Sequence, residues 1–369
     1  MDLIHLLYLI AMLAPVGLML IAVLVMRPGM SGTGTNLMWR RFSVLSVGAL
    51  LCAGAALALQ AGGLAGEAGT GVLLPWLRSS RTGSVLAILV QLLGTVIGAF
   101  SARYLQGEPG QQRYITALAG VLASVHLLLL ANHWLVLITA WALVGVALQP
   151  LLCFYPDRPF ALLAAHKKRI ADRMADVLLL VAAVLAWQEV GSGSLTDLWQ
   201  HLATHDTSIA LQISALCLVL AVVLRTALLP VHGWLTQVME APTPVSALLH
   251  AGVVNLGGYV LIRFAPLLEA SLLARIVLVG FGLATALLAG LVMLTRVSIK
   301  VRLAWSTVAQ MGFMVLQCGL GLYTLAALHL IGHSLYKAHT FLSASTAVRD
   351  SKQQMMHLRL TPSVSSLIA

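Results

Sequence analysis

Three titratable side chains near the C-terminal end of the sequence follow one another at intervals of four residues. They are His329, His333 and Lys337. On a helix with about 3.6 residues per turn they share one face, and at about 1.5 Å of rise per residue they form a ladder about 12 Å long. Histidine changes charge near neutral pH, and burial lowers the pKa of a lysine toward that range. The spacing therefore favours an ion path along this face over a packing role, whereas His339 lies off the face.

A second group of polar residues interrupts the apolar sequence earlier in the chain. Arg225 stands five residues before Pro230. Proline has no amide hydrogen to donate, so a helix that contains Arg225 should end at this point. A membrane helix that stops and restarts around ionisable groups is a common place for handling ions. We predict a helix break at about 225–245, and the other ionisable residues and prolines within it or just after it are His232, Glu240, Pro242, Pro244 and His250.

Two ionisable residues keep alternative interpretations at this point. Asp176 is either the inner entrance of an ion path or a counter-charge for Arg225, or else it is a helix-end residue at the lipid headgroups. His250, taken alone, fits an ion path and also fits an ordinary hydrogen bond between helices. We assign Asp176, His232 and Glu240 supporting roles beside Arg225 and the C-terminal ladder.

The composition indicates what these residues are embedded in. The chain is 60% hydrophobic and 9% charged, with a mean hydropathy of +0.94, which is far more apolar than a soluble domain needs. We therefore predict one all-α integral membrane domain over residues 1–369. Apolar runs long enough to cross about 30 Å of hydrocarbon number about eleven. The predicted spans are 4–25, 43–63, 84–101, 114–131, 133–152, 172–189, 209–229, 244–265, 271–294, 303–320 and 322–347.

The basic residues predict the orientation of these spans. Most of the 22 lysines and arginines fall in alternate loops, namely those that follow odd-numbered spans, and in the C-terminal tail. Basic loops stay in the cytoplasm, so the amino terminus is expected outside and the carboxyl terminus inside a bacterial inner membrane. The same alternation makes a nucleic-acid-binding role unnecessary to explain the net charge of +10.

Motifs for catalysis, metal binding and nucleotide binding are absent from the sequence. The four cysteines (52, 153, 217 and 318) lie in or beside apolar spans without a CxxC spacing, and no HExxH, GxSxG or GxxxxGK[ST] pattern occurs. We expect neither enzymatic activity nor a metal or cofactor in this chain.

Four stretches resemble a known family of membrane proteins. They are 228–235 (LLPVHGWL), 241–251 (APTPVSALLHA), 298–312 (SIKVRLAWSTVAQMG) and 333–338 (HSLYKA). They are similar to the antiporter-like, proton-conducting subunits of respiratory complex I and of multisubunit sodium/proton antiporters, with a likeness that runs over about 100–348. Within that superfamily, 154–159 (FYPDRP), 165–169 (AHKKR) and 333–343 (HSLYKAHTFLS) look most similar to DabB-type membrane subunits of two-component inorganic-carbon pumps.

The sequence departs from the usual pattern of this superfamily at three places. A glutamate is usual in a Trp-Glu-x-x-Gly setting in the fifth span, and the corresponding 141–145 stretch has Ala142 instead. A lysine is usual in the seventh span, where Arg225 stands; arginine stays protonated and is expected to act as a fixed counter-charge. The superfamily also continues through further helices with another ionisable site, so the chain is expected to be a shortened or fragmentary member.

The resemblance implies a function and a partner. The chain would conduct ions, protons or sodium, through Arg225, His250 and the ladder, and this flux would drive carbon dioxide hydration in a cytoplasmic partner. That partner would be of the DabA type, similar to zinc carbonic anhydrases, and would hold the zinc. Two rival readings remain. One is a cation/proton antiporter or proton-translocating oxidoreductase subunit, against which the absent glutamate argues; the other is a non-conducting membrane anchor for a partner.

Overall fold

The computed structural model describes residues 3–26, 34–63 and 75–356, with side chains as far as Ala344, and nearly all of these residues are helical. The long helices are α1 (Leu3–Val25), α2 (Thr35–Ala61), α4 (Arg81–Tyr104), α5 (Gln111–Leu130), α6 (Trp134–Leu152), α7 (Pro159–Val190), α9 (Ile209–Arg225), α14 (Leu272–Leu294), α15 (Ile299–Gly319) and α16 (Tyr323–Met356). The shorter ones are α8 (Leu195–Thr204), α10 (Gly233–Gln237), η1 (Val238–Glu240), α11 (Thr243–Ala251), η2 (Val253–Asn255), α12 (Leu256–Arg263) and α13 (Ala265–Glu269).

Each of the eleven predicted spans overlaps a helix, and the span at 244–265 is divided between α11 and α12. Seven stretches among the described residues are long and apolar enough to cross a membrane: α1, α2, α4, α5, α6, Thr243–Arg263 and α14. The apolar helix α9 is shorter, at 17 residues. For α9 and for the more polar α7, α15 and α16, crossing stays a prediction. The chain is an all-α, multi-pass membrane bundle.

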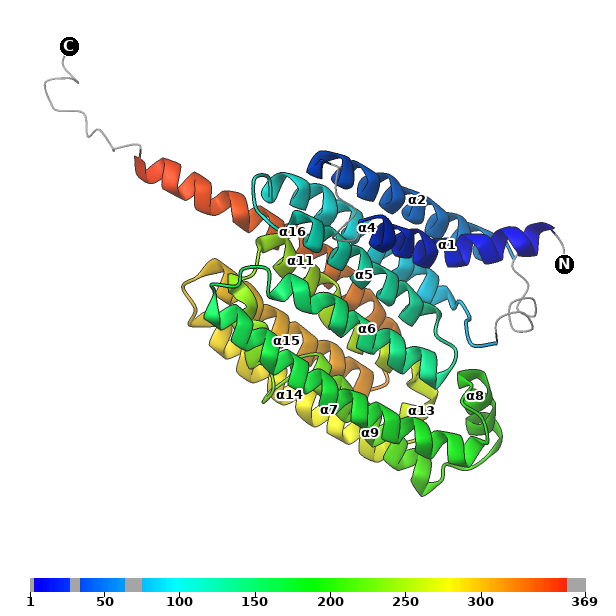
Figure 1. Cartoon of the computed structure of the whole chain (residues 1–369). Coiled ribbons are helices and arrows are strands. Elements are labelled where there is room, and N and C mark those ends of the chain that lie inside the picture. The colour runs from blue at the N-terminus through cyan, green and yellow to red at the C-terminus, as the bar shows by residue number, and fades with distance from the viewer. Residues whose placement is uncertain (1–2, 27–33, 64–74, 357–369) are drawn as a thin grey trace, which may run out of the picture.

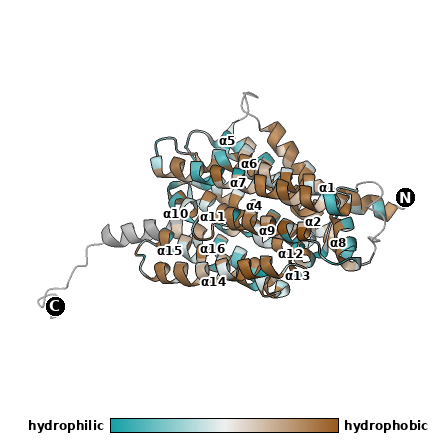
Figure 2. Ribbon diagram, turned by 90° about the horizontal axis from the view of Figure 1, so that it is seen from below, coloured by the Kyte–Doolittle hydropathy of each residue, from teal (hydrophilic) through white to brown (hydrophobic). Residues whose placement is uncertain are grey.

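The broken span Thr243–Arg263 lies in the centre of the bundle. In its most apolar stretch 89% of the residues are buried within the protein, compared with 22% in α14 and 28% in α2. Helix α11 packs against α4 and α16, and Figure 1 shows α11 and α16 between the group α1, α2 and α4 and the group α14 and α15. Hydrophobic residues cover the sides of the long helices, and hydrophilic ones gather near α8 and α10 (Figure 2). Among the candidate membrane spans of the described residues, the broken span is thus the most deeply buried within the protein.

Local sequence signals explain where several helices begin and end. The hydroxyls of Ser80, Ser208 and Ser271 accept hydrogen bonds from backbone N–H groups in the first turns of α4, α9 and α14. Helix α7 begins with Pro159, whose fixed φ suits the first helical position. It ends at Gly191, which adopts a left-handed φ of 76° that other residues rarely tolerate.

The predicted break over 225–245 is present in the structure. Helix α9 ends at Arg225, Pro230 lies in the following turn, and α11 begins with Pro242 as its N-cap and Pro244 within its first turn. A second break was not predicted. Helix α11 ends at Ala251, Gly252 takes φ −121° and ψ −71°, and a single 3-10 turn leads into α12. The predicted span over 244–265 is therefore present as Thr243–Arg263, but it is not one continuous helix.

Candidate functional site

Arg225, the last residue of α9, is almost fully buried, with 6% of its surface exposed. Its Nη1 donates to the backbone oxygen of Trp141 on α6 at 2.8 Å, and its Nη2 donates to the carboxylate of Asp176 on α7. The guanidinium also lies over the Trp141 ring, 4.6 Å from the ring centroid. Because arginine stays protonated, these contacts hold a fixed positive charge between three helices.

Two buried carboxylates on one face of α7 pair with the positive charges of this region. Asp176 accepts from Arg225 and also from Nη1 of Arg173 at 3.1 Å. One turn earlier, Asp172 accepts from Nζ of Lys168 at 2.5 Å, and both of these side chains are buried. Of the interpretations left open for Asp176, the structure favours the counter-charge for Arg225, because the carboxylate points into the bundle at that residue.

Lys168 and Asp172 were not among the predicted site residues. The predicted spans 133–152 and 172–189 leave 153–171 as a loop, and as the loop after an odd-numbered span it is expected in the cytoplasm. The structure instead begins α7 at Pro159, so Lys168 lies in a helix and turns inward. The four-residue spacing from Lys168 to Asp172 and on to Asp176 was the available signal, since it places all three on one helical face.

A cavity of about 370 Å³ opens beside this charge cluster, between α5, α6 and α7. Ala142 and Gly145 line it from α6, where the resemblance places the family's glutamate. A Cβ added at Gly145 would lie 2.8 Å from Oδ2 of Asp172, so the α7 carboxylates reach close to the α6 backbone. The other lining residues are Arg113, Val146, Gln149, Pro150, Cys153, Arg169, Asp172, Arg173 and Asp176.

The predicted ladder on α16 points mainly into the bundle. His333 and Lys337 are buried, and His329 is half-buried. The rings of His329 and His333 meet edge to face with centroids 6.1 Å apart. Lys337 donates from Nζ to the backbone oxygen of Leu303 at 3.1 Å and to the hydroxyl of Ser306, both on α15. Lys337 has no carboxylate partner among the described residues.

His250 joins this ladder from α11. Its ring is fully buried and stacks on Phe341 of α16, with centroids 4.6 Å apart. It also interacts electrostatically with His333 and Lys337. Neither ring nitrogen has a hydrogen-bond partner among the described residues, so the interpretation of an interhelical hydrogen bond is not supported. The structure thus brings three of the predicted path residues together.

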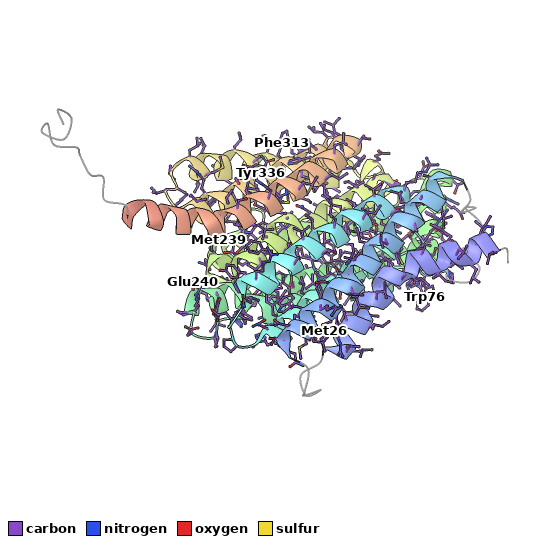
Figure 3. All side chains as sticks on the ribbon, turned by 90° about the horizontal axis from the view of Figure 1, so that it is seen from above. Met26, Trp76, Met239, Glu240, Phe313 and Tyr336 are labelled. Atoms are coloured by element: carbon purple, nitrogen blue, oxygen red, sulfur yellow. The ribbon has the colours of Figure 1, made fainter. Side chains whose placement is uncertain are left out.

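Two glutamines of α15 extend the ladder at its half-buried end. Nδ1 of His329 lies 3.0 Å from Oε1 of Gln317, and Nε2 lies 2.7 Å from Oε1 of Gln310. The ring also packs against Phe313, which Figure 3 shows on the same side of the molecule as Tyr336. Neither glutamine was among the predicted site residues, although their spacing of seven residues places them on one face of α15.

His232 and Glu240 lie apart from the ladder. The His232 ring packs against Trp305, with centroids 4.9 Å apart. Glu240 lies at the end of the bundle opposite Trp76 (Figure 3). There its Oε2 accepts from the backbone N–H of Ala161 at 3.3 Å, in the first turn of α7. A carboxylate at this position accepts from one of the free amides of the first turn and interacts favourably with the positive end of the helix dipole. Arg225 likewise contacts α6 and α7 rather than α16.

A further cavity, of about 570 Å³, lies at the other end of the helices. His133 is the N-cap of α6, where its Nδ1 accepts from the backbone N–H of Leu135 at 3.2 Å. Its ring stacks on Trp76 and meets Trp187 edge to face. Burial lowers the pKa of His133 below its ordinary value, so the ring is neutral near pH 7. Arg78 and Asp197 also line this cavity.

Comparison with known proteins identifies the family. The sequence model described as "NADH:quinone oxidoreductase/Mrp antiporter, TM" matches residues 131–367, well over half of the chain. The chain belongs to this family. The match includes Arg225, the broken span and the α16 ladder, and it begins after α5.

Two similar proteins carry the name DabB, which the sequence resemblance predicted. A probable inorganic carbon transporter subunit DabB2 of Halothiobacillus neapolitanus is 47% identical over 83% of this chain and 55% of its own. A probable inorganic carbon transporter subunit DabB of Hydrogenovibrio crunogenus is 45% identical over 78% of this chain and 56% of its own. The predicted resemblance is confirmed, and the chain spans about half the length of these relatives.

The fold of the family is also known from solved structures. The Mrp complex from Dietzia sp. DQ12-45-1b contains a chain that superposes with a TM-score of 0.74, at 24% sequence identity, over 90% of this chain and 37% of that one. At this identity the likeness concerns the fold alone. It confirms the prediction of an antiporter-like helix bundle.

Proposed function

We propose that this protein is the ion-conducting membrane subunit of an inorganic-carbon transporter in a bacterial inner membrane. Cations would enter past His250, His333 and Lys337, and this entry would drive the hydration of carbon dioxide to bicarbonate in a cytoplasmic partner of the DabA type. The names of the two DabB relatives support the substrate class. The observation that carries the proposal is the burial of His250, His333 and Lys337 where α11 packs against α16, with the His250 ring stacked on Phe341 of α16.

Packing alone is a poor explanation for this cluster. An ionisable side chain in the membrane interior costs on the order of 3 kcal/mol by insertion scales, so such groups are rare unless they serve a purpose. A structural lysine in that position would be paired with a carboxylate, as Lys168 is with Asp172. Lys337 instead bonds to neutral oxygens of Leu303 and Ser306, which leave it free to exchange its proton.

Arg225 has a different part in this proposal. Its charge is balanced by Asp176, and it stays protonated, so it does not relay protons. The pair instead fixes the junction of α6, α7 and α9 beside the broken helix. We propose that it sets the local electrostatic potential through which an ion approaches the ladder.

The energetics of the coupling are sufficient. One charge that crosses about 150 mV releases about 3.5 kcal/mol, because 100 mV corresponds to about 2.3 kcal/mol per charge. At about 1.4 kcal/mol per factor of ten, that free energy supports a bicarbonate concentration ratio of about two and a half decades across the membrane. Zinc for the hydration chemistry would belong to the partner, and no step of it is assigned to this chain.

The proposal is tested by growth of a carbonic-anhydrase-deficient bacterium in ambient air. Co-expression of this chain and a DabA-type partner should restore growth, and neither gene alone should do so. His333→Ala and Lys337→Gln should each abolish the rescue while the two proteins still co-purify. The matched control is His339→Ala, since His339 lies on the same helix but is exposed. Full rescue by both ladder variants would instead support a non-conducting anchor.

The antiporter reading makes a different prediction in a second host. NADH-quinone oxidoreductase subunit L of Mycobacterium tuberculosis is also similar to this chain, with 32% identity over 72% of this chain and 42% of its own length. If sodium exchange were the function, expression would rescue a sodium-sensitive strain and leave the carbonic-anhydrase-deficient strain unable to grow in air. The position of Ala142 beside the α7 carboxylates favours the first proposal, because the glutamate usual there is missing.

A further inference from the structure

The second helix break, at Gly252, coincides with a set of buried polar atoms that lack partners. Among the described residues these include both ring nitrogens of His250, both ring nitrogens of His333, and Oδ1 of Asn255. The three residues are 0%, 5% and 3% exposed, respectively. Buried polar groups in proteins are nearly always hydrogen-bonded, and leaving one unpaired costs about 1–3 kcal/mol. Five unpaired atoms in neighbouring residues therefore indicate that something polar binds here.

Asn255 joins the two elements that carry the histidines. Its Nδ2 donates to the backbone oxygen of Ala251 at 2.9 Å and to the hydroxyl of Ser334 at 2.7 Å. Ala251 directly follows His250 on α11, and Ser334 directly follows His333 on α16. The amide of Asn255 thus lies between the positions next to each histidine, where the chain changes from α11 to α12.

The orientation of this amide is fixed by its surroundings. If the side chain were turned over, Oδ1 would face the carbonyl oxygen of Ala251, and two acceptors would lie about 2.9 Å apart without a hydrogen between them. The N–H group must therefore face Ala251. It follows that Oδ1 is an acceptor directed away from Ala251, without a donor among the described residues.

The unpaired atoms include both hydrogen-bond donors and acceptors, so the group that binds them must offer both. A neutral imidazole carries one N–H and one bare nitrogen, so His250 and His333 together offer two donors and two acceptors, and Asn255 adds an acceptor. Water satisfies groups of both kinds, whereas a bare metal cation satisfies acceptors only. A sodium ion would also stand close to the ammonium of Lys337, which interacts with both histidines.

We propose that Asn255 holds a water molecule in the break between α11 and α12, and that this water bridges His250 and His333. Its role in conduction rests on the function proposed above, but its binding does not. A proton that reaches one imidazole nitrogen through this water is matched by release of the proton on the other nitrogen, so the ring returns to its neutral form. Asn255 is then a positioning residue for the path and does not itself titrate.

The first test is direct and independent of transport. A high-resolution cryo-EM map of the complete complex should show density within hydrogen-bond distance of Oδ1 of Asn255, and Asn255→Leu should remove it. A filled site with metal-ligand distances near 2.4 Å, or a side chain closing on Oδ1 without any density, would overturn the proposal. If the water is present but His333→Ala keeps full carbon uptake, the proposed function fails while this inference stands.

The second test uses proton flux into vesicles that contain the complete complex. Asn255→Leu should slow the flux about tenfold, since an apolar side chain displaces an ordered water without replacing its bonds. The matched control is Ser334→Ala, which removes one bond to Nδ2 but leaves Oδ1 and the Ala251 contact, and which should change the flux less than about twofold. Equal losses in both variants would indicate a purely structural role and overturn the proposal.

Asn255→Asp tests the proposal through the pH dependence of the flux, which would not change if Asn255 had only a structural role. A carboxylate at this position favours the protonated imidazoles of His250 on α11 and His333 on α16. Lys337 opposes this effect, and so does His329 when it is protonated, because its ring meets that of His333. The pH at which flux is half-maximal should therefore rise by about one unit relative to the wild type. An unchanged pH profile in a folded, assembled Asn255→Asp complex would count against a water that contacts both rings. This test also applies if Asn255→Leu fails to fold.

Discussion

At the scale of single residues, the ionisable groups of the bundle fall into two kinds. Arg225 and Lys168 are held against the carboxylates of Asp176 and Asp172. Lys337 is bonded only to neutral oxygens, and His250 has no partner among the described side chains for either nitrogen. A paired charge is expensive to alter and an unpaired group is free to titrate, so the two kinds suit different tasks.

Breaking one of the buried ion pairs should have a large effect on stability. Asp176→Asn leaves the buried guanidinium of Arg225 without its carboxylate, and breaking a buried pair in this way typically lowers the free energy of unfolding by about 3–5 kcal/mol. The loss is measured as a fall in the thermal unfolding temperature of the purified protein in detergent. Arg173→Gln is the control, because the Arg173 side chain is 60% exposed and its bond to the same carboxylate should contribute less than about 1 kcal/mol.

A second substitution separates the charge from other effects of that change. Ala142 follows Trp141, whose backbone oxygen binds Arg225, and it lines the cavity that also contains Asp176. Adding A142E to Asp176→Asn supplies a carboxylate from α6 in place of the one lost from α7. About half of the lost stability should return. If A142E gives no recovery, the carboxylate of Asp176 acts through its specific geometry rather than through its charge.

At the scale of the elements, the sequence predicted those features of the helices that depend on residues close together in the chain. The four-residue spacing of His329, His333 and Lys337 and the prolines around 230–244 were sufficient to predict a titratable helix face and a broken helix. The break at Gly252 was missed because no proline marks it and the surrounding sequence is apolar. Its polar contact, from Asn255 to Ser334, joins residues 79 positions apart, which no local pattern reveals.

Two glycines set the distance between α14 and α15, and they predict a matched pair of outcomes. A Cβ at Gly282 would lie 2.6 Å from the backbone nitrogen of Leu316, and one at Gly312 would lie 2.6 Å from that of Ala286. Gly282→Ala and Gly312→Ala must push the two helices apart, at a cost of about 1–3 kcal/mol each. Gly280→Ala, with open space around it on the same helix, should be neutral. Thermal unfolding in detergent compares the three variants.

The cap of α6 predicts how stability depends on pH. The pKa of His133 is lowered in the folded protein by burial, whereas in the unfolded chain it has its ordinary value of about 6.5. As the pH falls through that value, the unfolded state binds the proton first, so the folded state loses stability down to the lowered pKa. Protonation would also abolish the acceptor at Nδ1 that caps the helix.

His133→Asn tests this dependence, since asparagine also caps helices but does not titrate. Between pH 7.5 and pH 5.5, the unfolding temperature of the wild-type protein should fall further than that of this variant. Arg78 and Asp197, which line the same cavity, are unchanged in the comparison. Parallel pH curves for the two proteins would show that the His133 ring is not the group responsible.

At the scale of the whole molecule, the two kinds of charge lie in different parts of the bundle. The paired cluster lies where α6, α7 and α9 meet, and the unpaired cluster lies where α11, α15 and α16 meet. The first fixes the positions of helices, and the second offers groups that change protonation without a buried partner to oppose them. This division makes the ladder the part of the bundle in which a change of side chain should alter transport more than assembly.

Lys337→Arg puts this division to the test. Arginine keeps the positive charge and can still donate to Leu303 and Ser306, but it does not release its proton at physiological pH. Uptake of labelled inorganic carbon by cells that express the complete transporter should fall about a hundredfold, the loss expected for removal of a proton-transfer group. Lys167→Arg, an exposed exchange of the same type on α7, should leave uptake unchanged.

Uptake by the wild type should also collapse when a protonophore removes the driving force. The residual uptake of the Lys337→Arg variant should then be insensitive to the protonophore. Normal, protonophore-sensitive uptake by Lys337→Arg would show that ions cross without titration of this lysine.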